Sequence, residues 1–263
     1  MSALTGWISH FLAGMRLQVA STSRDLRDLL PVATMPLSAM VAMAIFMHAQ
    51  RGDLSRYAMV AALCMTIGQM AFFIASEFVS SDRDSGILLS LIASPANYAA
   101  VLFGRTAPLV VLSAISGWAL ATSIIVSMAG SPPTIYHPAI FVGTLAATAY
   151  AATCTALLTA AIVALGRHAR TLQNSITGPV YLLSGVLVPT SYLPSWLAAI
   201  SPLSFFTWAA DLLRDCMMPG PVVDVGFRLF AIVVLGSAGA AVGGAALARM
   251  TARLRRSGQF SLS

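Results

Sequence analysis

Long apolar stretches alternate along this chain with short segments that hold nearly all of its charged residues. A helix needs about 20 apolar residues to cross the roughly 30 Å hydrocarbon layer of a bilayer. The stretches are continuously apolar rather than alternating, which favours helices over the strands of a barrel. Six stretches meet this requirement, the fifth being short: about residues 29–48, 57–76, 106–129, 139–165, 174–189 and 225–248.

Composition points the same way. Charged residues make up 9% of the chain, against about 25% in ordinary globular domains. Hydrophobic residues reach 58%, which is more apolar surface than one soluble core of this size could cover. The sequence therefore predicts an all-α polytopic membrane protein with six transmembrane helices, forming a single transmembrane domain over residues 1–263.

The segment before the first stretch has its own pattern. Apolar residues recur there at helical spacing, namely Leu4, Ile8, Phe11, Met15 and Val19. This pattern predicts an amphipathic helix over about residues 3–27 that lies in the membrane interface. A flexible leader is the alternative.

The placement of arginine predicts the orientation, because the chain has no lysine. If the N-terminus is cytoplasmic, eleven of the 15 arginines fall in inside segments and four in outside segments. Basic residues concentrate on the cytoplasmic side, so both termini are expected there. A basic face beside anionic lipid then accounts for the net charge of +6 without a nucleic-acid partner. Abundant Ala and Arg without Lys hint at a GC-rich bacterial source, hence a bacterial inner membrane.

Motifs that would carry chemistry within this chain are not found. A Walker-type phosphate loop requires a lysine, and no catalytic or metal-ligand arrangement is legible. Cys64, Cys154 and Cys216 are interpreted as buried free thiols. Glu77 is the one acidic residue that adjoins a span interior, whereas ion-driven transporters use intramembrane ionisable groups. We therefore expect no catalytic residue, no metal and no cofactor bound by this chain.

A first distinctive segment follows the second stretch. It begins with Asp82, Arg83 and Asp84, which we expect to be solvated, and it breaks at Ser94-Pro95, because the residue before a proline disfavours helix. Between these points the apolar residues at helical spacing are Ile87, Leu88, Leu91 and Ile92. The pattern predicts a short amphipathic helix on a cytoplasmic loop that docks into a groove of a soluble partner. A helix that merely caps the membrane is the alternative.

A second distinctive segment follows the short fifth stretch. It is apolar but is interrupted by Pro189, Pro194 and Pro202, so short broken helices dipping into the outer leaflet are expected instead of a further span. Asp211 and Arg214 are three residues apart and can pair on one helix face. An ordinary surface pair that contributes little is the alternative.

At these two segments the chain resembles the permease subunits of the type-2 export family of ABC transporters, including the daunorubicin-resistance and nodulation-factor export permeases. The family's first pattern is met by Asp82-Arg83-Asp84, Gly86, Leu88-Leu89 and Ser94-Pro95. Its closing signature is met by Pro202 and Asp211-Leu212-Leu213-Arg214. The chain departs from the family in Ser201, where Asn is frequent, and in Asp82 and Asp84, where Glu is frequent.

The resemblance implies that this chain is a permease subunit. It would assemble with a second permease chain, identical or homologous, and with two separate ATPase subunits that bind ATP and Mg. It implies an ATPase-coupling set of Glu77, Asp82, Arg83, Asp84, Gly86, Leu88, Leu91, Ser94 and Pro95. It implies an external signature of Pro189, Pro202, Asp211 and Arg214. Because spans two and five line the path in this family, it suggests the pathway residues Gln69, Phe72, Phe73 and Tyr181. For a lone Gln or Tyr in a span, an interhelical hydrogen bond is the alternative.

The cargo is left open between an amphiphilic drug, a lipid and a glycoconjugate, with multidrug or antibiotic resistance as one setting. Two other classes remain: a membrane-embedded lipid-modifying enzyme and a non-transporting membrane assembly subunit. Gly236, Gly239, Gly243 and Gly244 give the last stretch a small-residue face, which we expect to pack inside the subunit.

Overall fold

The computed structural model describes residues 3–24, 34, 41, 55–84, 86, 97–130, 132–165, 178–187 and 194–257. Within these residues the regular structure is helical and contains no strand, which confirms the all-α prediction for the described part of the chain. The helices with defined bounds are α1 (Ala3–Arg24), α3 (Ser55–Asp84), α5 (Tyr98–Ala129), α6 (Pro138–Leu165), α8 (Ser195–Ala198), the 3₁₀ helix η4 (Ser201–Leu203), α9 (Phe205–Asp215) and α10 (Val225–Ser257).

Four of these helices are long and apolar enough to cross a membrane. Their candidate spans are Tyr57–Arg83, Tyr98–Ser127, Pro138–Ala164 and Val225–Arg253. A fifth candidate is the pair Ser195–Leu203 and Phe205–Asp215, which is bent by 94°. The predicted first span, 29–48, lies outside the described residues except for 34 and 41, and the predicted fifth is described over 178–187. The six-span topology therefore stays a prediction.

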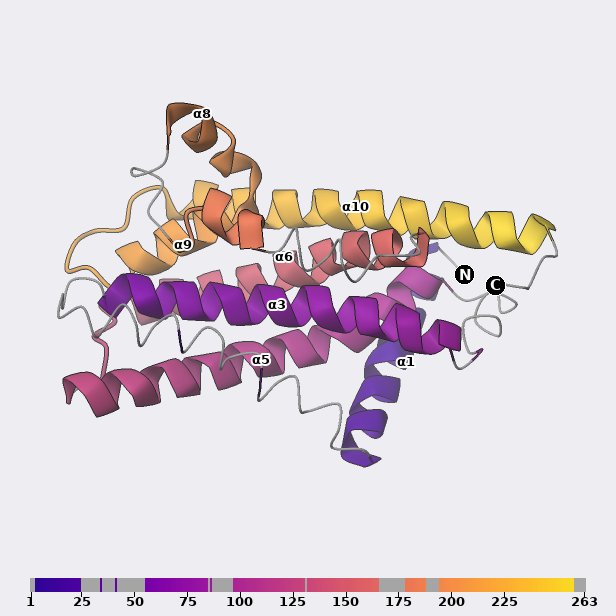
Figure 1. The fold of residues 1–263 in the computed structure, drawn as a ribbon, viewed down its shortest axis with the longest axis horizontal. Helices are drawn as coiled ribbons and strands as arrows, with labels where there is room; N and C mark the ends of the chain where they lie inside the picture. The colour runs from indigo at the N-terminus through magenta and orange to yellow at the C-terminus, as the bar shows by residue number, and fades with distance from the viewer. Residues whose placement is uncertain are drawn as a thin grey trace.

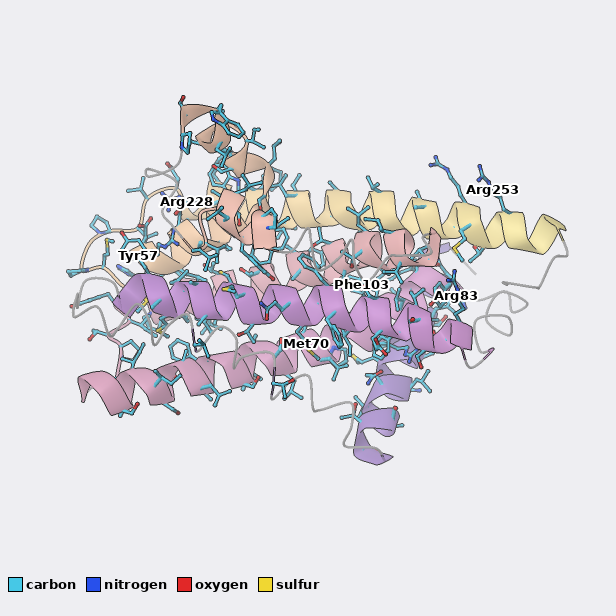
Figure 2. All side chains as sticks on the ribbon, in the orientation of Figure 1. Tyr57, Met70, Arg83, Phe103, Arg228 and Arg253 are labelled. Carbon is cyan, nitrogen blue, oxygen red and sulfur yellow. The ribbon has the colours of Figure 1, made fainter. Side chains whose placement is uncertain are left out.

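The long helices lie side by side along the molecule (Figure 1). In this view α3, α5, α6 and α10 run lengthwise, and α1 crosses one end, where α10 also finishes. The short helices α8 and α9 lie at the opposite end. We call these the α1 end and the α9 end. Arg83 and Arg253 lie at the α1 end, and Tyr57 and Arg228 lie at the α9 end (Figure 2).

Local sequence explains where the helices start and stop. Asn97 caps α5, because its side chain accepts hydrogen bonds from the amides of Ala99 and Ala100. Gly130 ends α5 at φ 73°, and its amide donates to Val126. Pro138 opens α6 at the first helical position, where the missing amide costs nothing. The helix α5 thus begins eight residues before the expected span at 106 and continues through Pro108.

The helix α3 occupies the centre of the bundle. It packs against α5, α6 and α9, and 83% of its most apolar window is buried inside the chain, against 22% for α10. In lipid, hydrophobicity does not determine which helices pack together, because lipid is as apolar as the helix surfaces. Shape and polar contacts decide the position of each helix in the bundle. Helix α3 is therefore the most buried of the four long helices, while α10 packs mainly on α6 and α1 packs on α5.

Small residues set the closest helix contacts. A Cβ atom at Gly14 would collide with the carbonyl of Val101, and one at Gly104 would collide with the carbonyl of Phe11, so these glycines allow α1 and α5 to cross in contact. Along α10, a Cβ at Gly236 would lie 2.5 Å from Cα of Ala151, and one at Gly239 would lie 2.6 Å from Cγ2 of Thr155. Three of the four glycines of the expected face, Gly236, Gly239 and Gly243, thus pack on α6 inside the subunit, whereas Gly244 does not.

Neighbouring glycines on α10 give a matched test of this packing. A Cβ at Gly243 would collide with the backbone of α6, 2.5 Å from the carbonyl carbon of Leu157, whereas one at Gly244 would meet nothing within 4 Å. We expect Gly243→Ala to lower stability by about 1–3 kcal/mol through overpacking. Gly244→Ala should be neutral or stabilising by up to about 1 kcal/mol, because alanine favours helix. Thermal unfolding of the purified variants measures the difference, and equal midpoints would contradict the packing.

Candidate functional site

A buried ion pair joins α3 to α5 near the α1 end. One terminal nitrogen of Arg105, Nη1, lies 3.0 Å from both carboxylate oxygens of Asp82, and the hydroxyl of Tyr98 donates to the same carboxylate at 3.3 Å. The guanidinium carbon of Arg105 lies 4.1 Å from the ring centroid of Phe78. We call these four residues the Asp82 cluster.

The burial of Asp82 corrects an expectation from the sequence. Its side chain is 3% exposed and that of Arg105 is 15% exposed, so Asp82 is not solvated. A charge removed from water requires a partner and hydrogen bonds, and the cluster supplies both. The candidate span Tyr57–Arg83 therefore carries Asp82 as well as Glu77, which is half-buried.

Arg83 and Gly86 complete the end of α3. A terminal nitrogen of Arg83 donates to the carbonyl of Ala164 at 2.8 Å, near the C-terminus of α6, where the last carbonyls of a helix lack partners within it. Gly86 has φ 72° and donates its amide to the carbonyl of Arg83, a conformation that suits glycine just beyond a helix. Asp84 is the last residue of α3.

The Asp82 cluster lies at the base of the loop with the predicted coupling helix. The loop leaves α3 after Asp84 and enters α5 at Tyr98. The positions Leu88, Leu91, Ser94 and Pro95 lie outside the described residues, so the coupling helix stays a prediction. Asp82 lies on one side of the loop, and Tyr98 and Arg105 lie on the other, so the two ends of the loop are joined directly.

A second buried arginine organises the α9 end. Arg214 donates from Nη2 to the carbonyls of Gly185 at 2.6 Å and Val186 at 3.0 Å, and from Nη1 to Asp211 at 3.1 Å. Its guanidinium carbon lies 5.0 Å from the ring centroid of Tyr57. We call these five residues the Arg214 cluster. It joins α9, the segment 178–187 and the start of α3.

The predicted pairing of Asp211 with Arg214 is confirmed. Only the Asp211 side of the pair resembles a surface pair, with its side chain 44% exposed; the Arg214 side chain is 6% exposed and its other bonds go to backbone carbonyls. Those carbonyls follow the helical turns at 178–183, where Gly185 takes φ 71° and the helix stops. Arg214 therefore satisfies polar groups that the broken helix leaves open.

The broken helices before Arg214 are held by hydrogen bonds between them. The hydroxyl of Thr207 donates to the carbonyl of Ser201 at 2.6 Å, and the indole of Trp208 donates to the carbonyl of Pro202 at 3.0 Å. These bonds fold α9 back on η4 and fix the 94° bend. Short helices are thus confirmed over 195–215, and Pro189 lies outside the described residues.

The four proposed pathway residues separate into two environments. Phe72 and Tyr181 are packed in the interior around Phe206, with ring centroids 6.3 Å and 5.4 Å from it, and a Cβ at Gly68 would collide with the Tyr181 hydroxyl. The half-buried positions of α3 instead recur at helical spacing: Met65, Gln69, Phe73, Glu77 and Ser80. We call this set the α3 stripe; Gln69 and Phe73 belong to it, whereas Phe72 and Tyr181 do not.

Sequence reasoning did not pair Arg105 or Tyr98 with Asp82, nor Tyr57 with Arg214. A usable signal was present for Arg105, the one charged residue within Tyr98–Ala129. An isolated charge in an apolar helix needs an opposite charge, and Asp82 is a nearby acidic residue in the sequence. The sequence holds no comparable signal for the contact between Tyr57 and Arg214, because the stacking of a cation on an aromatic ring depends on the three-dimensional structure.

The family model described as ABC-2 type transporter matches residues 11–218 of the chain. The chain belongs to the ABC-2 type transporter family. The matched region runs from α1 past the end of α9 and includes both arginine clusters, while α10 lies beyond it.

This membership makes the chain a multi-pass membrane permease and a transport subunit of an ABC system. ATPase subunits are the general kind of partner for such a chain. No curated protein sequence matches the chain significantly. The family match therefore establishes the class of protein to which the chain belongs.

The buried and exposed ion pairs provide a matched stability test. Removing one partner of a buried pair costs about 3–5 kcal/mol, so Arg105→Ala should lower the thermal midpoint strongly. The pair between Arg228 and Asp215 is 23% and 36% exposed, and Arg228→Ala should cost no more than about 1 kcal/mol. Thermal unfolding in detergent compares them.

A double variant separates loss of charge from loss of packing. Asp82→Leu combined with Arg105→Met replaces the pair by apolar side chains, which is often neutral for stability. We expect it to unfold near the unmodified protein. A double variant as unstable as Arg105→Ala would show that the stability comes from shape and not from compensating charges.

Proposed function

We propose that this chain is the permease subunit of an ATP-driven exporter that moves an amphiphilic substrate out of the cytoplasm or inner leaflet. Two permease chains, identical or homologous, would assemble with two ATPase subunits that bind ATP and Mg. The observation that carries the proposal is the Asp82 cluster, which joins both ends of the loop between α3 and α5.

The cluster supports a route for mechanical coupling. A partner that pushes on residues 87–92 would move α3 and α5 together, because the ion pair between Asp82 and Arg105 prevents the loop ends from separating. Arg83 would pass the movement to α6 through the carbonyl of Ala164. At the other end, Arg214 ties α9 and the segment 178–187 to Tyr57 of α3. Closure of the ATPase dimer would thus reach the external helices.

The α3 stripe is the surface proposed to face the substrate path. It combines apolar and polar side chains, which suits an amphiphile with both kinds of surface. Gln69 and Phe73 are retained as pathway residues on this ground. Phe72 and Tyr181 would act indirectly, by holding α3 against Phe206.

The orientation proposed is cytoplasmic for the α1 end, in a bacterial inner membrane. Arg83 and Arg253 lie at this end (Figure 2), and α1 and the end of α10 lie there together (Figure 1). Basic residues favour the cytoplasmic face. The bent helices from Ser195 to Asp215 would then lie at the outer face, near the substrate exit.

Cysteine labelling tests this orientation. Trp196→Cys places a thiol on a position that is 67% exposed, and Ala252→Cys places one near the end of α10. In intact cells a membrane-impermeant maleimide should label the first and not the second. Native background should be low, because Cys64, Cys154 and Cys216 are buried and burial raises the pKa of Cys216 to about 11, which keeps it a poorly reactive thiol. The reverse labelling would overturn the topology.

The decisive experiment reconstitutes the chain with its ATPase subunits. Leu88→Asp with Leu91→Asp should leave membrane insertion and ATP hydrolysis intact but reduce export of an amphiphile panel to background, because charges would not enter the apolar docking groove. The control is Leu88→Met with Leu91→Met, a volume-conserving change that should be tolerated. Asp82→Leu with Arg105→Met should also uncouple hydrolysis from export.

Two results would count against the proposal. Unchanged export by the Leu88→Asp and Leu91→Asp variant would remove the coupling assignment. Failure of any ATPase subunit to co-purify, together with uphill transport by the chain alone, would exclude the ATP-driven exporter.

Two further results would favour the alternative functions. A product formed from lipid by the chain alone would favour the lipid-modifying enzyme. The absence of both transport and product would favour an assembly subunit.

A further inference from the structure

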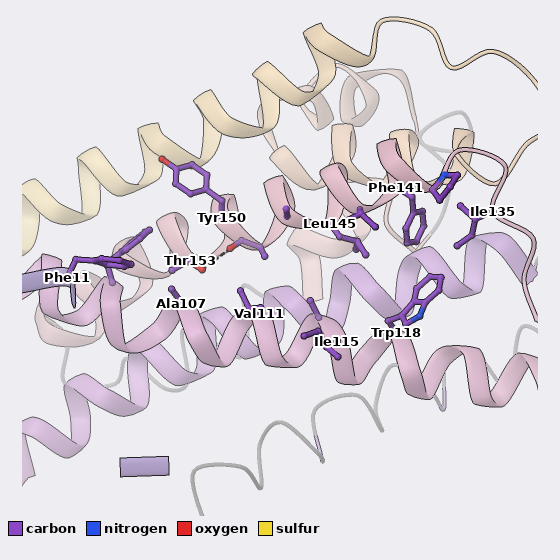
Figure 3. Close-up of a pocket in the computed structure, with 16 residues that line it drawn as sticks. Phe11, Ala107, Val111, Ile115, Trp118, Ile135, Phe141, Leu145, Tyr150 and Thr153 are labelled. Atoms are coloured by element: carbon purple, nitrogen blue, oxygen red, sulfur yellow. Dashed lines mark hydrogen bonds between the residues drawn. The ribbon is translucent and has the colours of Figure 1, made fainter. Parts of the chain in front are cut away.

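A large apolar groove lies between α5 and α6 (Figure 3), and no residue of either arginine cluster lines it. Its volume is about 780 Å³, and sixteen residues line it, from α1, α5, α6 and the segment before α6. None of these sixteen is charged, and none comes from α3. The groove is therefore separate from the α3 stripe.

Small side chains create the hollow. Ala107 and Ala114 are seven residues apart on α5, and Ala146 and Ala149 are three apart on α6, so each pair lies on one face of its helix. Because these alanine side chains are short, they leave space between α5 and α6 unfilled. Larger neighbours such as Val111 and Leu145 form its walls.

Aromatic rings close the two ends of the groove. At the α1 end the ring centroids of Phe11 and Phe103 are 5.8 Å apart, and toward the other end those of Trp118 and Phe141 are 5.1 Å apart. From Phe103 to Trp118 the groove follows fifteen residues of α5, which is about 22 Å of helix. It therefore extends over most of the roughly 30 Å hydrocarbon layer.

The lining offers almost nothing to a polar ligand. The hydroxyl of Tyr150 bonds to the hydroxyl of Ser237 on α10 at 3.0 Å, and that of Thr153 donates to the carbonyl of Ala149 at 2.7 Å. The indole of Trp118 packs against Phe141. A water needs two to four polar partners, and a charged headgroup needs a counter-charge, so the groove suits neither.

We propose that this groove binds one acyl chain of a bilayer phospholipid, held as a ligand between α5 and α6. Both walls belong to candidate membrane spans, so the medium that reaches the groove is lipid hydrocarbon. An unfilled hollow of this size would forfeit dispersion contacts along both helices, and packing is what holds helices together in lipid. The chain fills the hollow and links α5 to α6. This proposal needs only the membrane location and does not depend on export.

Photocrosslinking tests it on the full chain in vesicles of phosphatidylethanolamine and phosphatidylglycerol with a trace of phospholipid carrying a mid-chain diazirine. We expect adducts concentrated on α5 and α6 peptides that include Ala107 and Ala146, and reduced by excess unlabelled phospholipid. Ala146→Phe fills the groove and should reduce these adducts about tenfold, the factor that corresponds to roughly 1.4 kcal/mol. Ala119→Phe, at an exposed α5 position outside the lining, should leave them unchanged.

A second measurement guards against misfolding of the variant. Added phospholipid should raise the thermal midpoint of the delipidated protein and of Ala119→Phe, because a ligand of the native state stabilises it. Ala146→Phe should start from a similar midpoint and show no such rise. Adducts spread evenly over the exposed faces of α5, α6 and α10 would mean bulk lipid only. Labelling of exposed α10 peptides without adducts on the α5 and α6 groove peptides would mean that lipid does not enter the groove. Either result overturns the proposal.

Discussion

The ion pair between Asp82 and Arg105 is the constraint on which the rest of the bundle depends. Each charge costs several kcal/mol to remove from water, and the cluster offsets this with the two contacts from Arg105, the Tyr98 hydroxyl and the face of Phe78. An apolar pair could join the helices at lower cost but would tolerate sliding. The ion pair does not tolerate sliding, because a shift of α3 against α5 would leave the buried Asp82 carboxylate without its partner. The pair therefore fixes the register of the two helices that carry the loop.

Arginine contacts to backbone carbonyls extend the same logic to the helix ends. Arg83 donates a hydrogen bond to the carbonyl of Ala164 near the end of α6. Arg214 donates to the carbonyls of Gly185 and Val186, where the helical segment 178–183 stops. In hydrocarbon such carbonyls have no water to accept from, so interrupted helices persist only where protein groups satisfy them. Both arginines lie near the ends of the bundle, where a helix can stop without exposing its backbone to lipid.

Much of the fold could be predicted from the sequence, because apolar length is a strong signal. The structure places α6 at Pro138–Leu165, one residue from the expected start, and it forms short helices in the proline-containing segment, with α8 starting directly after Pro194 and η4 containing Pro202. The helix α5 begins at Tyr98, eight residues before the expected span, because the pairing of Arg105 with Asp82 lets the helix include a charged residue that by pattern alone ends an apolar stretch. The solvation of Asp82 was wrong for the same reason: contacts between residues 23 apart cannot be deduced from the pattern of either segment alone. The pairing of Asp211 with Arg214 was predictable because it is local to one helix turn.

The central position of α3 limits how the protein could move in a transport cycle. Gly68 admits Tyr181 and Phe206 against α3, and both rings are almost fully buried. Sliding α3 past them would open a void and break the bonds of the Arg214 cluster at the same time, and bulky groups removed from a packed interior cost several kcal/mol. Movement of α3 together with its packed neighbours leaves these contacts intact. Under the proposed function, the surface whose contacts would change is the α3 stripe, where Gln69 and Phe73 are half-buried. A rigid subunit that rearranges against a second chain along this stripe would open a path without unpairing its own buried charges.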